Sequence, residues 1–376
     1  MHQLNLIKHF DYVKNILIFI AVCTVLFFSG KAESYDNKNI HPWEPPSPSI
    51  DNYDWIQLTS KEWLKGDLEG LYGNRLEFDS DKLGYLEFEW TDVRQVRSHD
   101  ILTMRFDKQI IVSGYLTIVE DRVLITNGDE KKDFDRTQLV SITSSYSKII
   151  DLWKTQIGLG LNILKGNTDQ IQYNMKANLK RRSVKTEFEF DYLGNYVSTD
   201  NIQTSESQRI SSNFDMFKTR NFFLRLIHAE YYRDPFQNIK YRETVGAGIG
   251  LDLIDTYRTS WNIKTGPAYQ KTRFKSVEEG KDSTASTLAL LTGTSFDKEL
   301  SGKLDFLAQY TFYIVNRKSG LYMHHAVVTL ETELTDVLDF DISIIWDRTQ
   351  RPVPKSDGTI PEKDDFKLIF SIAIDF

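Results

Sequence analysis

Apolar and polar residues alternate with a period of two through most of the second half of the chain. The clearest runs begin at Ile157, Ile171, Phe188, Val245, Trp261, Leu304, Phe340 and Phe366. Less regular runs cover 210–217, 222–232, 288–296 and 322–334. Because successive side chains of a strand point to opposite faces, each run predicts a strand with one apolar face. The sequence therefore predicts about twelve strands, each near the ~10 residues that a tilted membrane-spanning strand requires.

The connections between these strands alternate in length. Short turns are expected at 181–183, 218–221, 255–257, 297–302 and 335–339, and longer polar segments at 198–205, 233–240, 272–283 and 349–364. Short periplasmic turns and longer outer loops are typical of an outer-membrane β-barrel. An even strand number would place both ends of the barrel in the periplasm. A soluble β-sandwich also alternates, but its strands are usually shorter, about 5–6 residues. We therefore predict an antiparallel transmembrane β-barrel over residues 150–376.

The polar faces of the predicted strands carry charges of both signs. The expected inward-facing charges are Lys185, Glu187, Glu189, Asp191, Lys303, Asp305, Asp339, Asp341 and Asp347. A basic residue at the lipid midplane costs roughly 2–4 kcal/mol, so these side chains must face a wet or ion-paired lumen. A barrel of about twelve strands is wider than the eight-stranded type that side chains fill, yet narrower than a general porin. The pattern predicts a small, partly occluded pore.

The last predicted strand has a continuous apolar face that ends at the final residue of the sequence. This face consists of Phe366, Phe370, Ile372, Ile374 and Phe376. Such a strand looks like the C-terminal recognition strand of outer-membrane proteins. We expect it to act as an assembly signal, bound by the barrel-assembly machinery through strand addition at an edge. Outer-membrane lipid is the other partner expected of the barrel wall.

The N-terminus has the features of a secretory signal peptide over residues 1–32. Lys8 and Lys14 precede an apolar run at 15–28. The small residues of Gly30-Lys31-Ala32 predict cleavage after Ala32. A single anchoring helix is the alternative, for which the run is short. The only cysteine, Cys23, lies in this run behind Val22, which does not fit a lipoprotein signal. Residues 33–50 hold four of the nine prolines and predict a disordered linker.

Residues 51–145 predict a separate all-β module built from two similar halves. The first half contains Gly66, Asn74-Arg75 and a Phe88-to-Val93 segment; the second contains Gly114, Asp121-Arg122 and a Phe134-to-Leu139 segment. Such internal repetition predicts one supersecondary unit used twice, here a small SH3-like or Sm-like barrel. We expect this module in the periplasm, contacting a periplasmic protein or peptidoglycan.

The charge of the chain is concentrated in this module. Residues 51–145 hold 19 acidic and 12 basic residues, a net charge of −7 that equals the net charge of the whole chain. An acidic domain argues against binding nucleic acid or anionic headgroups through a basic patch. A solvated acidic surface and a site for a divalent cation or cationic partner remain as alternatives.

Several motifs resemble one family of bacterial envelope proteins. They are Trp153-x-x-x-Ile157-Gly158-Leu159-Gly160 followed by Gly166-Asn167-Thr168, the glycine-rich strand Tyr241 to Gly250, and the terminal Phe376. In this order they resemble the YdiY-like salt-induced outer membrane protein family, over about 150–376. The stretch from Trp55 to Gly66 resembles the periplasmic extension that some members carry. The resemblance implies an outer-membrane location and supplies no catalytic residues.

No constellation in the sequence predicts catalysis, a cofactor or a bound metal. The barrel histidines are His228, His324 and His325, and the last two must point to opposite faces of a strand. We expect a non-enzymatic barrel with a structural or narrow-pore role and a periplasmic interaction module. One alternative is an outer-membrane enzyme that modifies lipid or lipopolysaccharide with a lumen-facing His324 or His325. Another is a surface adhesin or receptor that uses 272–283 and 349–364.

Overall fold

The computed structural model describes residues 52–144, 153–165, 169–335 and 337–375. They form a nine-stranded sheet and a closed barrel of twelve strands. The expected signal peptide (1–32), the expected linker (33–50) and Phe376 lie outside these ranges. No helix within them is long and apolar enough to cross a membrane.

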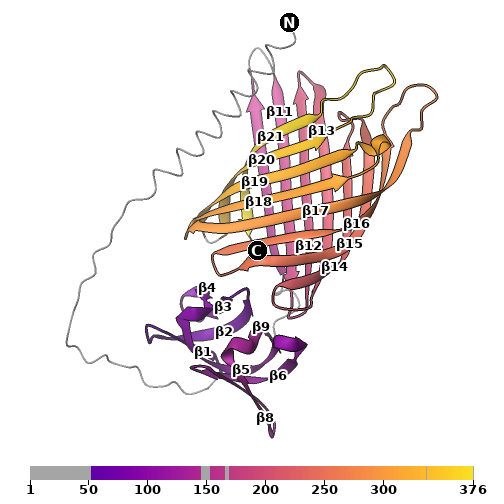
Figure 1. Ribbon diagram of the computed structural model, residues 1–376. Helices are drawn as coiled ribbons and strands as arrows, with labels where there is room; N and C mark the ends of the chain where they lie inside the picture. The colour runs from indigo at the N-terminus through magenta and orange to yellow at the C-terminus, as the bar shows by residue number, and fades with distance from the viewer. Residues whose placement is uncertain (1–51, 145–152, 166–168, 336, 376) are drawn as a thin grey trace, which may run out of the picture. The chain divides into compact units, whose positions relative to one another are not determined.

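The N-terminal module contains nine strands and three single-turn 3-10 helices (Figure 1). The strands are β1 (Asp54–Leu58), β2 (Trp63–Tyr72), β3 (Arg75–Ser80), β4 (Gly84–Glu89), β5 (Val93–Phe106), β6 (Ile111–Val119), β7 (Arg122–Asn127), β8 (Glu130–Asp135) and β9 (Leu139–Ser144). The 3-10 helices are η1 (Trp90–Asp92), η2 (Asp107–Gln109) and η3 (Arg136–Gln138). Strand order is β4-β3-β2-β1-β5-β6-β7-β8, and β9 pairs with β2 and β5.

The two halves of the module have the same strand register. Asp54 of β1 lies opposite Gly66 of β2, and Leu102 of β5 lies opposite Gly114 of β6. A Cβ at Gly66 would approach the backbone oxygen of Asp79 to 1.9 Å, and one at Gly114 would approach that of Thr126 to 2.7 Å. Both positions therefore require glycine because a neighbouring backbone passes close by.

A single hydrophobic core runs through both halves. Its fully buried side chains include Ile56, Leu68, Leu76, Phe78, Val96, Leu102, Met104, Leu116, Ile118, Val123 and Ile142. The module is thus a small barrel-like β unit in which the long strand β5 serves both halves.

Asp54 ties three strands of the module together. Its carboxylate accepts hydrogen bonds from the backbone N–H of Leu68 (2.8 Å) and of His99 (2.6 Å). In the second half the Ser98 hydroxyl accepts from the N–H of Leu116 in the same way (2.6 Å). Burial raises the pKa of Asp54 above its usual range, against the lowering effect of the two N–H donors.

We expect Asp54→Ala to destabilise the module, because two buried N–H groups lose their acceptor, which costs roughly 2 kcal/mol or more. The raised folded-state pKa means that the folded protein binds this proton more tightly. The Asp54 carboxyl therefore makes its full contribution to the free energy of unfolding below its unfolded-state pKa of about 3.9. This contribution declines as pH rises through the raised folded-state pKa. Urea unfolding followed by tryptophan fluorescence should show a larger wild-type-to-variant difference at pH 4 than at pH 7.

The exposed Asp129→Ala, in the turn between β7 and β8, is the matched control and should leave stability unchanged at both pH values. An equal effect of the two substitutions would show that Asp54 has no such bridging role.

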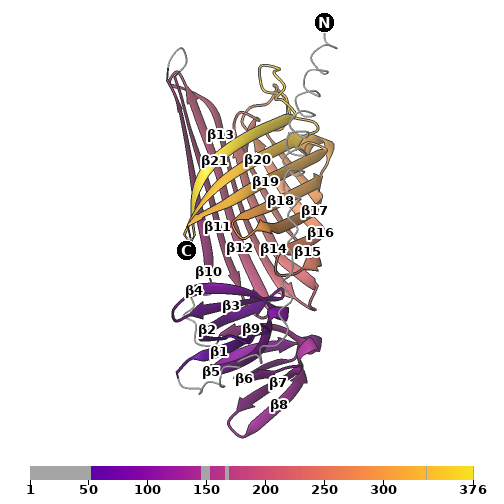
Figure 2. The same ribbon diagram turned by 90° about the vertical axis from the view of Figure 1, so that its left-hand side faces the viewer.

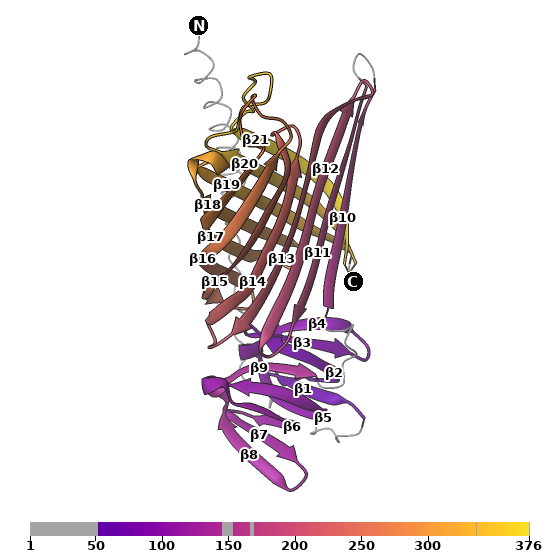
Figure 3. The same cartoon turned by 90° about the vertical axis from the view of Figure 1, so that its right-hand side faces the viewer.

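Twelve antiparallel strands close into the barrel that the sequence predicts (Figures 1, 2 and 3). They are β10 (Trp153–Leu164), β11 (Gln170–Arg182), β12 (Thr186–Thr199), β13 (Ile202–Phe217), β14 (Phe222–Asp234), β15 (Ile239–Asp255), β16 (Thr259–Phe274), β17 (Thr284–Ser301), β18 (Leu304–Ile314), β19 (Tyr322–Thr335), β20 (Leu338–Thr349) and β21 (Asp364–Asp375). Closure occurs between β21 and β10 over four residue pairs, from Gln156 opposite Asp375 to Leu159 opposite Ile372.

The connections largely follow the expected alternation. Short turns lie at or beside all five predicted positions, and longer loops at 275–283 and 350–363. The longer connection predicted at 233–240 is shorter than expected, because β14 and β15 leave only 235–238 between them. The longer connection predicted at 198–205 is wrong: β12 and β13 continue to a two-residue hairpin at Asp200 and Asn201. Both residues have positive φ, 51° and 62°, which Asp and Asn tolerate and which two-residue hairpins favour. The connection at 315–321, with η4 (Arg317–Ser319), was not predicted.

The outer wall of the barrel is apolar, as alternation predicts. On β21 the exposed fractions are 63% for Phe366, 54% for Phe370 and 43% for both Ile372 and Ile374, which places these four side chains on one outward face. A wall of this kind is suited to lipid, because outward-facing residues of a membrane barrel contact acyl chains. The role of this face as an assembly signal stays a prediction.

Candidate functional site

The lumen of the barrel holds most of the charges that the sequence places inside. Glu187, Glu189 and Asp191 line internal cavities, and Asp347 is part of a buried ion-pair network. The prediction is wrong for Lys185 and Lys303. Both are exposed and lie in turns, because β12 begins only at Thr186 and β18 only at Leu304.

A network of charged side chains crosses the half of the lumen next to the long loops. Its members are Arg209, Glu230, His325, Asp347, Asp365 and Lys367, called here the Arg209 network. Arg209 contacts Glu230 and Asp347, each at 2.7 Å, and its guanidinium lies over the ring of Tyr232. His325 Nδ1 lies 2.8 Å from Asp347, and Lys367 lies 2.7 Å from Asp365. Strands distant in sequence are thereby joined across the interior.

Apolar packing fills most of the remaining space at this level. Ala268, Ala289, Leu291, Tyr313, Val315 and Met323 form a buried cluster. The Tyr313 hydroxyl also donates to Glu230 at 3.2 Å. The cavity beside the Arg209 network measures about 20 Å³, room for about one water molecule. The barrel is therefore narrowed here by its own wall side chains.

Asn238 fastens three loops together at the same end of the barrel. Its side-chain amide donates to the carbonyls of Ser276 (2.8 Å) and Val353 (3.1 Å), and its Oδ1 accepts from the N–H of Ser276 (3.0 Å). The connections after β14, β16 and β20 are thus linked through one buried amide. These hydrogen bonds hold the three connections together at the loop end of the barrel.

The lumen is wider toward the opposite end. A cavity of about 140 Å³ borders the Arg209 network, and one of about 310 Å³ follows. Arg225 holds Asp215 with two hydrogen bonds of 2.8 and 2.7 Å, and both side chains are buried. This buried pair is therefore neutral as a unit.

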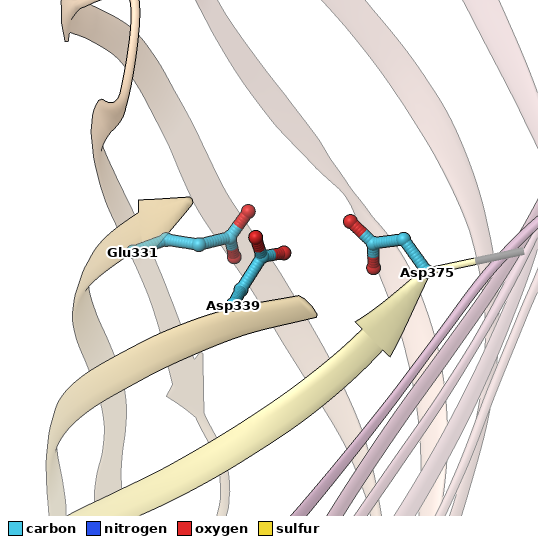
Figure 4. Close-up of side chains that lie close together, drawn as sticks. All are labelled: Glu331, Asp339 and Asp375. Carbon is cyan, nitrogen blue, oxygen red and sulfur yellow. The ribbon is translucent and has the colours of Figure 1, made fainter. Parts of the chain in front are cut away.

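Three carboxylates meet at the end of the barrel away from the long loops. Glu331 of β19, Asp339 of β20 and Asp375 of β21 each place an oxygen within 4.8 Å of the others (Figure 4). The sequence shows no metal-ligand spacing here because the three residues belong to different strands. Only the strand register brings them together.

The three histidines of the barrel have separate partners. His325 faces the lumen and is held by Asp347, whereas His324 is hydrogen-bonded to the Tyr310 hydroxyl (2.8 Å) and stacked on Trp346. His228 Nδ1 lies 2.9 Å from the Asn213 side chain. In the part of the chain that the structure describes, these contacts give none of the three a serine nucleophile of the lipase kind.

The Arg225–Asp215 pair should show strong coupling in a double-mutant cycle. We expect Arg225→Leu to cost about 3–5 kcal/mol, because it leaves a buried carboxylate without its partner. The double variant Arg225→Leu/Asp215→Leu should cost less than either single change. Urea unfolding of the barrel in lipid vesicles measures this. The exposed pair Arg122–Asp135 of the N-terminal module, measured by urea unfolding of that module, is the control, with an expected coupling below ~1 kcal/mol. Additive effects at Arg225 and Asp215 would contradict the prediction.

Several solved membrane barrels are similar to this chain in fold. The NanC porin matches with a TM-score of 0.36 and 10% identity, over 60% of this chain and 98% of that one. The translocator domain of the autotransporter NalP from Neisseria meningitidis matches with a TM-score of 0.33 and 12% identity, over 60% and 87%. A porin refined at 1.8 Å resolution matches with a TM-score of 0.28 and 9% identity, over 86% and 98%.

The sequence comparisons identify the family. No curated protein matches the chain. The family model described as "Protein of unknown function, DUF481" matches residues 157–376, which is the barrel almost in full. The chain therefore belongs to this family, that of the YdiY-like outer membrane proteins.

Proposed function

We propose that this protein is a structural or narrow-pore barrel of the outer membrane, in which the Arg209 network forms the constriction. The observation that supports the proposal is the decrease in cavity volume along the lumen, from about 310 Å³ to about 20 Å³ beside the Arg209 network. Small solutes and water fit the wider part. At the network, passage requires displacing paired charges.

The pairing of these charges also determines which ions could pass. Asp347 contacts both Arg209 and His325, and Glu230 contacts Arg209, so neither carboxylate is left as a free cation site. A hydrated ion would have to exchange its water shell for a network whose members already satisfy one another. This supports low conductance with weak ion selectivity.

Single-channel recording in planar bilayers tests this arrangement. The wild-type protein should give a conductance far below that of a general porin. Arg209→Ala should raise it and make it cation-selective, because the guanidinium in the lumen is lost while Glu230 loses its cationic partner and remains as an uncompensated carboxylate.

Arg273→Ala is the matched control, since Arg273 is an exposed arginine of β16. Its conductance should equal that of the wild type. Unchanged conductance in Arg209→Ala, or a wild-type conductance like that of a general porin, would contradict the Arg209 network as the constriction.

The same contacts support a non-catalytic role for His325. In the Arg209 network the carboxylate partner of His325 is itself bound to Arg209, and Lys367 lies 3.8 Å from it. An imidazole held by a carboxylate resembles two members of a hydrolytic triad, but a positioned hydroxyl must complete it. We propose that His325 serves the constriction and not a reaction.

We also propose that residues 51–145 lie in the periplasm and contact another envelope component, a protein or peptidoglycan. Residues 145–152 separate β9 from β10 and can span at most about 30 Å. The module must therefore lie on the side of the membrane where β10 begins. That is the rim of the short turns, which in outer-membrane barrels faces the periplasm. The net charge of −7 favours a partner with basic or cationic groups.

Cysteine labelling tests this orientation, because Cys23 in the expected signal is the only cysteine of the sequence. A membrane-impermeant maleimide should label Asp129→Cys only after the outer membrane has been permeabilised. It should label Ser283→Cys, in a long loop, on intact cells. Labelling of Asp129→Cys on intact cells would place the module outside the cell and contradict the proposal.

A further inference from the structure

The carboxylates of Glu331, Asp339 and Asp375 converge from the last three strands of the barrel. Figure 4 shows the Glu331 and Asp339 carboxylates side by side, with the Asp375 carboxylate facing them from the end of β21. One oxygen of each lies within 4.8 Å of the others, and the Asp339 side chain is only 5% exposed. Three acidic groups in so small a volume repel one another unless a positive charge joins them.

A fourth carboxylate, Asp341, adds an independent observation. It lies directly opposite Glu331 in the ladder between β19 and β20, and two residues from Asp339 on the same face of β20. Asp341 is completely buried. Its Oδ2 lies 3.3 Å from the Lys176 ammonium, whereas its Oδ1 has no hydrogen-bond partner among the described residues. The Oδ1 of Asp375 is also buried without a partner there. Such oxygens are costly unless a donor or a cation reaches them.

Other buried carboxylates of the lumen have basic partners. Asp215 is held by two hydrogen bonds from Arg225, and Asp347 contacts Arg209 and His325. In the cluster of four carboxylates, the ion pair found among the described residues joins Lys176 to Asp341. Asp215 and Asp347 are thus neutralised by basic side chains, whereas in this cluster Lys176 is the cationic partner found among the described residues.

We propose that Glu331, Asp339 and Asp375, with Asp341 beside them, bind a divalent cation of the calcium class. Calcium takes oxygen ligands at 2.3–2.6 Å, so two ligands on opposite sides lie up to about 5.2 Å apart. The 4.8 Å limit fits this sphere without rearrangement. Magnesium keeps several of its waters and is usually bound through one or two carboxylates, so a site with three or four carboxylates favours calcium.

The position of the cluster gives the cation a role in closing the barrel. Asp375 lies opposite Gln156 in the seam between β21 and β10, which is paired over only four residue pairs. By comparison, β10 pairs with β11 over twelve. A cation held by Glu331, Asp339 and Asp375 links β19, β20 and β21 at the paired end of this short seam. It therefore stabilises the three strands that lead to this seam, independently of any conductance.

Calcium titration of the full-length protein tests the proposal. The protein is extracted in detergent, stripped with a chelator and titrated with CaCl2 in a calorimeter, where one site per chain is expected. Asp339→Asn and, separately, Glu331→Gln should weaken binding at least about tenfold, the lower end of what the loss of even an outer-shell partner costs. Asp282→Asn, an exposed loop position, is the matched control and should bind as the wild type does.

Heat-modifiable gel mobility gives a second readout and checks folding of every variant. Calcium should raise the temperature at which the wild type and Asp282→Asn lose the folded band, and should leave that of Asp339→Asn unchanged. If Asp339→Asn does not fold, the calcium affinity of Glu331→Gln is the test of the proposal. Absence of calcium binding by the wild type would overturn the proposal and show that protons neutralise the cluster. Equal calcium affinity in the Glu331→Gln variant, or tighter binding of magnesium, would overturn it as well.

Discussion

The backbone hydrogen bonds of the barrel are the constraint on which the rest of the structure depends. Hydrocarbon offers no partner to an N–H or C=O group, so a sheet in lipid must close on itself. Twelve strands achieve this through ladders between sequence neighbours and one non-local seam, β10 with β21. Closure fixes which side chains share the lumen, and it therefore creates both the Arg209 network and the carboxylate cluster.

Among the described residues, side chains of the barrel wall occupy the lumen. Twelve strands enclose more space than eight, and here the wall side chains themselves occupy much of it. Arg209 is suited to this role because its planar guanidinium reaches two carboxylates while stacking on Tyr232. Lysine at this position would offer a point charge without the same two-sided geometry. The loops tied by Asn238 lie at the same end, so narrowing and loop closure reinforce one another.

The two ends of the lumen follow different electrostatic rules. At the loop end, acidic and basic side chains compensate one another, which favours a fixed, self-satisfied interior. At the turn end, Glu331, Asp339, Asp341 and Asp375 are acidic, with Lys176 as the cationic partner found among the described residues. The proposed cation site lies where the closing seam is shortest, so added binding energy there acts on the strands that hold the barrel shut. The proposed constriction and the proposed cation site thus lie in separate clusters.

The sequence by itself determined the features that depend on local backbone geometry. Period-two alternation indicates a strand wherever it occurs, so the apolar outer face of Phe366, Phe370, Ile372 and Ile374 and the strand count followed from it. The similar halves of the module, marked by Gly66 and Gly114, were also visible in the sequence. Local chemistry was less reliable at strand ends: Lys185 and Lys303 lie in turns, and the Asp200-Asn201 hairpin is shorter than the polar composition of 198–205 indicates.

Only the tertiary structure decided which charges meet. Arg209 and Asp347 are separated by 138 positions in the sequence, and nothing local marks them as partners. Likewise Glu331, Asp339 and Asp375 come together through the register of three strands and carry no motif. The physical reason is that contacts across a lumen depend on barrel diameter, strand tilt and stagger, which are properties of the closed sheet as a whole.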